Sequence, residues 1–534
     1  MRARRVLLST ALFSLTLVTA LSAPGCRNGK QQPVEAPPEQ PPPPPSPPLQ
    51  ITNPVLPGDY PDPSVVRVGD EYWATATSAE WAPQFPLLKS KDLLSWEQVD
   101  HIFPTPPEWS EAQYWAPELV IDKGRAFAVY TARKKGGPLC VGVATAPTVS
   151  GPYTDRGPLV CQELGSIDGA MIRDENDKLY LVWKEDGNSK DLPTPLWAQP
   201  MSEDGTQLIG EKKTILLNDV PWEGQLIEGP NLIKRNGYLY VFYAGAGCCG
   251  KGCNYGVGVA RSKKLLEGWE KNPLNPIMKN NESFKCPGHG TVVTDPQGQD
   301  YFMYHAYRVT DSVYAGRQGV VDEITWGADG WPTINARRGV GGQVLAKPPA
   351  WSDEFSSTTL TQGWQWPNRR KPVMSITDGM LTLAPPSERA MDPLGGVLAR
   401  RSPSGNYTAV AVLDRTGLAA ETVAGLSAYG DSQNAVGVAL HGNKVEVWRR
   451  QDNKPQTIAS LDAPAGGKLH LRMTARKGHL LQFAVSPDGN VWTNVGEQNG
   501  DYLPPWDRSV RVALTSGGAP GASVRFDSLR ITPE

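Results

Sequence analysis

The stretch EGPNLIKRNGYLYVFY, residues 228–243, has a short apolar segment, a turn at Asn236-Gly237 and a second segment rich in aromatic residues. Apolar and aromatic residues alternating on both sides of such a turn predict a β-hairpin. The same order of features occurs five times between residue 54 and about residue 346. The other copies are DPSVVRVGDEYWATAT from Asp62, WAPELVIDKGRAFAVY from Trp115, DGAMIRDENDKLYLVW from Asp168 and HGTVVTDPQGQDYFMY from His289.

This repeat predicts the fold class. Successive copies begin about 53 to 61 residues apart, which leaves room for about four short strands in each interval. A hairpin repeat of this length is typical of β-propeller blades, so five copies predict an all-β, five-bladed propeller. A sandwich of unrelated hairpins would not keep the turn and the aromatic strand in a constant phase.

The first residue of each copy is the candidate site. The inner strand of every blade lines the central axis of a propeller, so these five positions should meet at one end of it. They are Asp62, Trp115, Asp168, Glu228 and His289. Carboxylates that lie close together raise the free-energy cost of ionising one another. A purely structural protein would gain nothing from grouping them. Cleavage of a glycosidic bond needs two carboxyl groups, and a third can keep the acid protonated.

Each of these residues also has a simpler interpretation. Asp62 in Asp-Pro-Ser is typical of a turn, and Glu228 could be a solvated loop carboxylate. Trp115 could lie in the core, and His289 could be a hydrogen-bonded core histidine. The constant phase of the five copies favours the shared site, whereas His305 is assigned to structure.

Composition narrows the class of protein. The chain has 534 residues, which suggests two to four domains, and its net charge is −2. No basic stripe is present, which argues against a nucleic-acid partner. The 54 glycines and 50 prolines favour many short strands joined by turns.

The N-terminus predicts export. Residues 1–26 have a basic start, an apolar run and small residues before Cys26, which is typical of a signal segment. The ending Gly25-Cys26 resembles a bacterial lipobox, so Cys26 is the expected lipidation site; cleavage after Ala23 is the alternative. Residues 27–49 are a proline-rich tether. We therefore expect a lipid anchor at the cell envelope as the only membrane contact, or otherwise a secreted or periplasmic protein.

Six further cysteines follow in this exported chain: Cys140, Cys161, Cys248, Cys249, Cys253 and Cys286. An even number in an oxidising compartment predicts disulfides, and Cys140 with Cys161 is the expected pair because the two bracket one strand-turn-strand segment. The other pairings remain open. Zinc binding by the CCGKGC cluster with Cys286 is the alternative.

The blade repeat ends before Trp351. Strictly alternating segments with Asp-Gly and Gly-Asn turns follow, which predict an antiparallel β-sandwich. We therefore place a propeller domain at residues 50–348 and a sandwich at residues 349–534. Trp364 and Trp366 are candidates for carbohydrate platforms or for core packing.

Six motifs in order resemble one known family. YPDPSVV, WAPELV, SIDGAMIRDENDKLYLVWK, IEGPNLIKRNGYLYVFY, GHGTVV and ITWGADGWP are similar to the propeller hydrolases of glycoside hydrolase family 43, which include β-xylosidases, α-L-arabinofuranosidases and arabinanases. The second domain resembles the concanavalin A-like domain that follows the propeller in many family 43 β-xylosidases. Five-bladed fructosidases share this architecture, but the acid of that family lies in a Glu-Cys motif. The corresponding residues here are Glu228-Gly229-Pro230, which argues against a fructosidase.

The resemblance implies roles for the clustered residues. Asp62 would be the general base, Glu228 the general acid and Asp168 the modulator of its pKa, in an inverting mechanism. The family usually has proline where Gly169 stands here, which should loosen the backbone beside Asp168.

The resemblance also implies contacts to the substrate. Trp115 would form part of the sugar platform, and Arg317 would bind the terminal sugar, with Arg308 as a competitor. His289 would lie beside a structural calcium ion and its waters, and the chemistry itself would need no cofactor. From their position in the chain, Trp81 and Phe85 are expected at the pocket rim, with loop packing as the alternative.

Together these features predict an inverting, exo-acting hydrolase. It would release β-D-xylose or α-L-arabinofuranose from oligosaccharide or polysaccharide fragments of plant hemicellulose or pectin. An endo-arabinanase and a non-catalytic carbohydrate-binding surface propeller are the alternatives.

Overall fold

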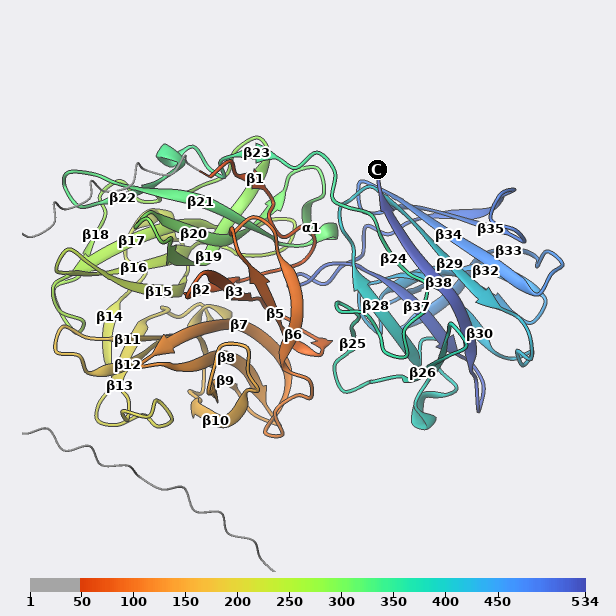
Figure 1. The fold of residues 1–534 in the computed structure, drawn as a ribbon, viewed down its shortest axis with the longest axis horizontal. Helices are drawn as coiled ribbons and strands as arrows, with labels where there is room; N and C mark the ends of the chain where they lie inside the picture. The colour runs from red at the N-terminus through yellow and green to blue at the C-terminus, as the bar shows by residue number, and fades with distance from the viewer. Residues whose placement is uncertain (1–48) are drawn as a thin grey trace, which may run out of the picture. The chain divides into compact units, whose positions relative to one another are not determined.

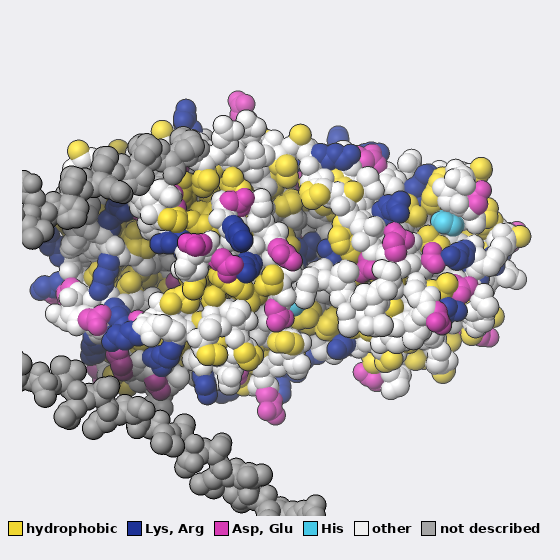
Figure 2. All heavy atoms as spheres, in the orientation of Figure 1, with side chains coloured by type: hydrophobic (Ala, Val, Ile, Leu, Met, Phe, Trp, Pro, Cys, Tyr) yellow, Lys and Arg dark blue, Asp and Glu magenta, His cyan; other side chains and the backbone are white. Residues whose placement is uncertain are grey.

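The computed structural model describes residues 49–534. The predicted export signal, the lipidation site Cys26 and the tether up to Pro48 lie outside these residues. Within the described part, no helix is both long and apolar enough to span a membrane. Positive and negative side chains are mixed across the face shown in Figure 2, which agrees with the small net charge.

Five antiparallel sheets of four strands make up the first domain. Blade one contains β2 (Ser64–Val68), β3 (Glu71–Thr75), β5 (Gln84–Ser90) and β6 (Glu97–Phe103), and blade two contains β7 (Ser110–Asp122), β8 (Arg125–Lys134), β9 (Leu139–Ala146) and β10 (Thr154–Val160). Blade three contains β11 (Ser166–Arg173), β12 (Leu179–Glu185), β13 (Leu196–Pro200) and β14 (Lys213–Leu216). Blade four contains β15 (Ile227–Arg235), β16 (Tyr238–Gly245), β17 (Gly256–Ser262) and β18 (Glu270–Lys271). Blade five contains β19 (Phe284–Thr294), β20 (Asp300–Arg308), β21 (Gln318–Trp326) and β22 (Pro332–Ile334).

The inner strands of these blades form a closed ring. Each of β2, β7, β11, β15 and β19 contacts the next, and β19 contacts β2 again (Figure 1). The prediction of a five-bladed propeller is therefore confirmed. The repeat could predict it because each hairpin buries its aromatic strand against the neighbouring blade, so the copies must keep one phase.

The segment before blade one closes the ring. Strand β1 (Thr52–Asn53) pairs in parallel with β23 (Gln343–Val344), which follows blade five. The side chain of Asn53 donates to the backbone oxygen of Val321 (2.8 Å) and accepts from its nitrogen (3.0 Å). These bonds satisfy buried polar groups and hold the ends of the domain together.

Each blade has a residue with left-handed backbone on its inner strand, or just before it, near the end of the axis. These residues and their φ values are Asp62 (50°), Ala116 (43°), Asp168 (57°), Gly229 (60°) and His289 (43°). Aspartate and histidine tolerate this region better than most residues, but it is sparsely populated and needs support from the surroundings.

Side chains of the preceding blade supply that support. Among the described residues, four of the five N–H groups donate to such a side chain. The bonds run from Asp62 to His305 Nδ1 (3.1 Å), from Ala116 to Thr77 Oγ1 (2.6 Å), from Asp168 to Thr131 Oγ1 (3.0 Å) and from Gly229 to Asp168 Oδ2 (2.9 Å). The backbone of each candidate site residue is thus positioned from the neighbouring blade.

The second domain is a two-sheet antiparallel sandwich, as predicted. One sheet contains β24 (Trp351–Asp353), β26 (Val373–Thr377), β27 (Met380–Ala384), β29 (Tyr407–Asp414), β34 (Lys468–Arg476), β35 (Leu480–Ser486), β36 (Thr493–Asn499) and β38 (Val524–Pro533). The other contains β28 (Gly396–Arg401), β30 (Val423–Tyr429), β31 (Ala435–His441), β32 (Lys444–Gln451), β33 (Lys454–Asp462) and β37 (Arg511–Gly517). Trp364 is buried and donates to Asp353 (2.9 Å), so it is a core residue.

The two domains share a buried polar contact. Strand β25 (Trp366–Pro367) pairs with β4 (Trp81–Ala82) of the propeller. The carboxylate of Asp59 accepts from the guanidinium of Arg511 (3.0 Å) and from the backbone nitrogen of Arg317 (3.2 Å). Asp59 and Arg511 are both buried.

All six cysteines that follow Cys26 form disulfides: Cys140–Cys161, Cys248–Cys249 and Cys253–Cys286. The predicted Cys140–Cys161 pair is confirmed. The zinc alternative is wrong, because the thiolates that would bind a metal are bonded to one another.

We expect Asp59→Ala to lower the free energy of unfolding by about 3 to 5 kcal/mol, because it leaves the Arg511 charge buried without its partner. Equilibrium denaturation in urea would measure this loss. Glu354→Ala is the matched control: it breaks an exposed pair with Arg530 and should cost less than about 1 kcal/mol. Equal losses in the two variants would contradict the prediction.

Candidate active site

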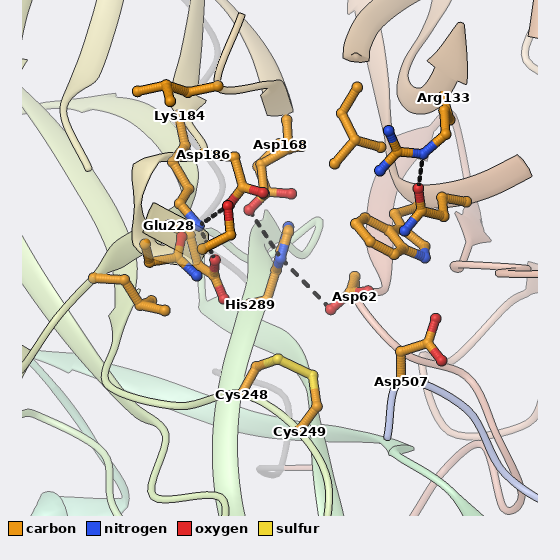
Figure 3. Close-up of a pocket in the computed structure, with 18 of the residues that line it drawn as sticks. Asp62, Arg133, Asp168, Lys184, Asp186, Glu228, Cys248, Cys249, His289 and Asp507 are labelled. Atoms are coloured by element: carbon orange, nitrogen blue, oxygen red, sulfur yellow. Dashed lines mark hydrogen bonds and ion pairs between the residues drawn. A yellow bond between two sulfur atoms is a disulfide. The ribbon is translucent and has the colours of Figure 1, made fainter. Parts of the chain in front are cut away.

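The five predicted positions meet in one cavity. Asp62, Trp115, Asp168, Glu228 and His289 all line a space of about 640 Å³ at the end of the propeller axis. Each of them comes from a different blade, and Figure 3 shows the three carboxylates around His289. The cavity thus combines acidic groups with an indole and an imidazole.

Asp62 is held by three neighbours. Its Oδ2 accepts from Thr77 Oγ1 (2.7 Å), its Oδ1 accepts from Arg317 Nη1 (2.9 Å), and His305 Nδ1 lies 3.2 Å from Oδ1. Burial alone would raise the pKa of Asp62, but Arg317, His289 and His305 outweigh it and hold that pKa well below its ordinary value. Asp62 therefore stays ionised and can accept a proton.

Glu228 is bound to a buried lysine. Lys184 Nζ donates to Glu228 Oε2 (2.6 Å) and to Asp186 Oδ1 (2.9 Å), and the Tyr255 hydroxyl donates to Glu228 Oε1 (2.8 Å). Burial opposes ionisation of Glu228, yet Lys184 and Tyr255 lower its pKa below the ordinary value. Glu228 and Lys184 form an ion pair in this state.

Asp168 has the opposite balance. Burial raises its pKa to about 6; the negative charges of Glu228 and Asp62 act in the same direction, whereas His289 and Lys184 lower it. Its Oδ2 accepts from the backbone nitrogen of Gly229, the residue after Glu228 (2.9 Å). Asp168 can therefore hold a proton at a pH at which Asp62 is ionised.

The backbone beside Asp168 is not loose. A Cβ atom added to Gly169 would lie only 2.5 Å from methyl groups of Val129 and Val141. Glycine stands there because the neighbouring blade packs directly against the backbone. The expectation that Gly169 loosens this region is therefore wrong.

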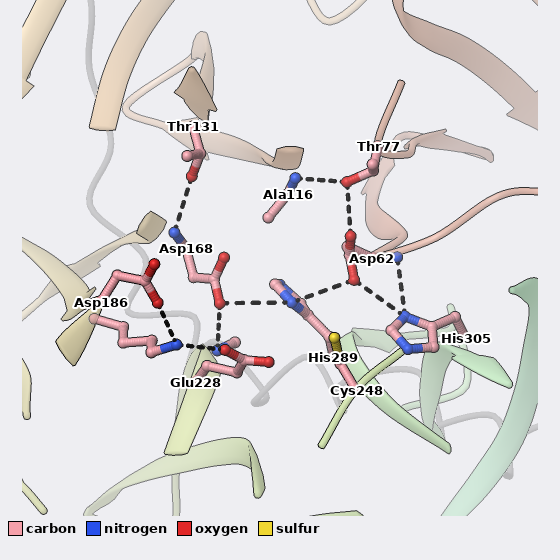
Figure 4. A network of polar contacts seen from close by, with 12 residues as sticks. Asp62, Thr77, Ala116, Thr131, Asp168, Asp186, Glu228, Cys248, His289 and His305 are labelled. Atoms are coloured by element: carbon pink, nitrogen blue, oxygen red, sulfur yellow. Dashed lines mark hydrogen bonds and ion pairs between the residues drawn. The ribbon is translucent and has the colours of Figure 1, made fainter. Parts of the chain in front are cut away.

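His289 lies between two of the carboxylates. Its Nδ1 is 3.5 Å from Asp62 Oδ1 and 3.8 Å from Asp168 Oδ2 (Figure 4). Calcium takes six to eight oxygen ligands, and residues 49–534 contain no group of three or more His, Cys, Asp or Glu side chains placed to hold a metal. The protein groups around His289 do not form such a cage, so a calcium ion held through water stays a prediction.

Arg317 joins the cavity to the second domain. Besides Asp62, its guanidinium binds the backbone oxygen of Asp507 (3.2 Å). Asp507 and Trp506 of the sandwich line the cavity, and the Trp506 ring lies 6.2 Å from that of Trp115. Arg308, the other candidate, does not line the cavity.

The structure corrects two predicted rim residues. Trp81 is 2% exposed and packs edge-on against Tyr429 of the sandwich, with ring centres 5.6 Å apart. Phe85 is fully buried among Phe103, Tyr114 and Tyr130. Neither lines the cavity. The rim prediction is wrong for both, and the alternative of packing holds. Each side chain removes more apolar surface from water by packing than it could at a rim.

Sequence reasoning missed the residues that support the carboxylates. In four blades, one side chain at the end of the second strand or just after it forms a hydrogen bond with the next blade. These residues are Thr77, Thr131, Lys184 and His305. In blades two, three and five this residue follows directly after the quoted repeat, so the repeat was one residue too short to include it. His305, assigned to structure, is in direct contact with Asp62.

Comparison with known proteins gives matches over most of the chain. A model of glycosyl hydrolases family 43 matches residues 51–332, and a model of the beta xylosidase C-terminal concanavalin A-like domain matches residues 352–505. The chain is 26% identical over 490 residues to xylosidase/arabinosidase 43B from Humicola insolens, covering 84% of this chain and 89% of the relative.

Two further matches extend over both domains. A non-reducing end alpha-L-arabinofuranosidase from Bacteroides ovatus is 25% identical over 463 residues, which cover 79% of this chain and 82% of that protein. Among solved structures, the GH43 BlXynB protein from Bacillus licheniformis matches with a TM-score of 0.77 at 25% identity, over 91% of this chain and all of that one (100%).

We expect Lys184→Met to raise the pKa of Glu228 and of Asp168, because Lys184 stabilises the ionised form of both. Carbon-13 NMR titration of the carboxyl groups would measure the shifts. Lys264→Met is the control, since Lys264 is exposed after β17 in blade four, does not line the cavity and pairs with Glu267. A Glu228 pKa that stays in place or falls in Lys184→Met would disprove this account of the ion pair.

Proposed function

Because the chain belongs to glycosyl hydrolases family 43 and is a glycosidase, we propose that its cavity removes single pentose units, with inversion, from the non-reducing end of hemicellulose or pectin fragments. The supporting observation is the convergence of Asp62, Asp168 and Glu228 in a cavity that the sandwich domain walls on one side. A walled cavity suits a chain end better than the middle of a polymer.

In this mechanism Asp62 is the general base. An inverting enzyme needs a carboxylate that takes a proton from water as the water attacks the anomeric carbon. Arg317 favours the ionised state of Asp62, and Thr77 with Arg317 orients its two oxygens. The left-handed backbone of Asp62 is part of this arrangement, because it directs the side chain into the cavity.

Glu228 is the general acid, and Asp168 tunes it. The leaving oxygen must receive a proton, yet Lys184 favours ionised Glu228 in the state described. Asp168 can nevertheless supply a proton beside Glu228, since burial raises its pKa to about 6. We assign the transfer to Glu228 and infer that this proton resides on Glu228 when the sugar is bound.

The remaining residues hold the sugar. Trp115 offers an apolar face to the ring, and the Arg317 guanidinium offers donors to its hydroxyl groups. His289 can bind a further hydroxyl from its place between Asp62 and Asp168. β-D-xylose and α-L-arabinofuranose both fit this description. The relative from Humicola insolens is named a xylosidase/arabinosidase, and the one from Bacteroides ovatus is named an alpha-L-arabinofuranosidase.

The stereochemical prediction is inversion. In a proton NMR time course on an aryl β-D-xyloside and an aryl α-L-arabinofuranoside, we expect one of the two to yield first the anomer opposite to that of the substrate. Glu228→Gln should still bind the sugar but lose more than about 100-fold in turnover of a xylose or arabinose disaccharide, whose poor leaving group needs the acid. Retention of configuration would rule out Asp62 as a base, and unchanged turnover would rule out Glu228 as the acid.

We also propose that the chain is exported and lipid-anchored through Cys26. Three disulfides among residues 49–534 support an oxidising compartment. In a bacterial host, labelled palmitate should be incorporated into the chain and lost in Cys26→Ala, which should then leave the membrane fraction. Ser22→Ala is the control and should stay labelled; label that persists in Cys26→Ala would contradict the proposal.

A further inference from the structure

The loop between β16 and β17 carries an unusual cavity wall. Its neighbouring cysteines, Cys248 and Cys249, are bonded to each other, and both line the cavity. In Figure 3 the Cys248–Cys249 disulfide lies below His289 and to the left of Asp507. None of the steps assigned above uses this disulfide.

The loop is held from several sides. Cys253 is bonded to Cys286 at the start of β19, three residues before His289. The backbone nitrogen of Gly250 donates to the Tyr307 hydroxyl (3.2 Å), and Lys251 Nζ donates to the backbone oxygen of Asp501 in the sandwich (2.7 Å). The loop is thereby tied to blade five and to the second domain, so the disulfide keeps a defined position in the wall.

The chemistry of this wall differs from that of the rest of the cavity. Two bonded sulfurs are polarisable, demand no hydrogen bond and pack against C–H groups by dispersion. The wall continues into Trp506, which is 59% exposed; a Cβ added to Gly250 would lie 3.8 Å from Cβ of Trp506. Cys248, Cys249 and Trp506 thus form an apolar surface beside buried carboxylates.

The position of the acid decides what this surface would bind. Glu228 is 8% exposed, on the inner strand at the end of the axis, so the sugar that is released lies toward the axis and the leaving group toward the opening. Resting on the proposed function, we propose that the Cys248–Cys249 disulfide, with Trp506, is the platform for the leaving-group sugar, the first unit of the chain that remains. This surface would determine how well the enzyme accepts oligosaccharides.

The test separates substrates that have a leaving sugar from one that has none. In Cys248→Ser/Cys249→Ser, kcat/KM should fall about 10-fold on the disaccharide of the pentose that the parent releases, mainly through a higher KM. With the glycosyl fluoride of the same sugar and anomer, whose leaving group is only a fluoride ion, the change should stay below two-fold. Trp506→Ala, a second variant that keeps all disulfides, should show the same selective loss.

Cys140→Ser/Cys161→Ser is the matched control, because it removes a disulfide neither of whose cysteines lines the cavity. It should leave the ratio of the two kcat/KM values unchanged. Equal losses on disaccharide and fluoride in both cavity variants, or no loss on either substrate, would overturn the platform. A parent that hydrolyses neither substrate would instead overturn the proposed function, and the platform with it.

Discussion

The hydrogen bonds that cross from one blade to the next at the end of the axis position the cavity. Left-handed backbone directs Asp62 and Asp168 inward, and this conformation costs on the order of 1 to 3 kcal/mol for a residue other than glycine. The side chains of His305 and Thr131, each from the preceding blade, bind the N–H groups of these two residues. Ring closure, through β19 against β2 and through Asn53, is therefore a condition for the site.

The second constraint is charge. Three buried carboxylates would repel one another, and the fold offsets this with two buried cations in defined places. Arg317 faces Asp62 and Lys184 faces Glu228, whereas no cation of residues 49–534 is in hydrogen-bond contact with Asp168, which keeps a raised pKa. Environments that separate the pKa values of neighbouring carboxyl groups are what acid and base roles require.

The fold and the five converging positions could be predicted because both follow from the phase of a repeat. Supporting residues such as Lys184 also obey that phase, but they come directly after the repeat in the sequence. Trp506 and the Cys248–Cys249 disulfide belong to loops outside the repeat, so only tertiary contacts bring them to the cavity. Trp81 departs from the predicted rim position because an aromatic residue near a site in sequence can pack into a domain contact as readily as it lines a rim.

One feature of the wall bears on how the protein is made. Trp506 and Asp507 stand about 30 residues from the end of the chain, whereas Asp62, Asp168 and Glu228 all precede residue 230. A ribosome therefore completes all three of these carboxylates long before it adds Trp506 and Asp507. A newly made propeller can close its ring during synthesis and still have an open site until the sandwich docks. Truncation before Trp506 would accordingly remove this part of the wall and leave Asp62, Asp168 and Glu228 in the chain.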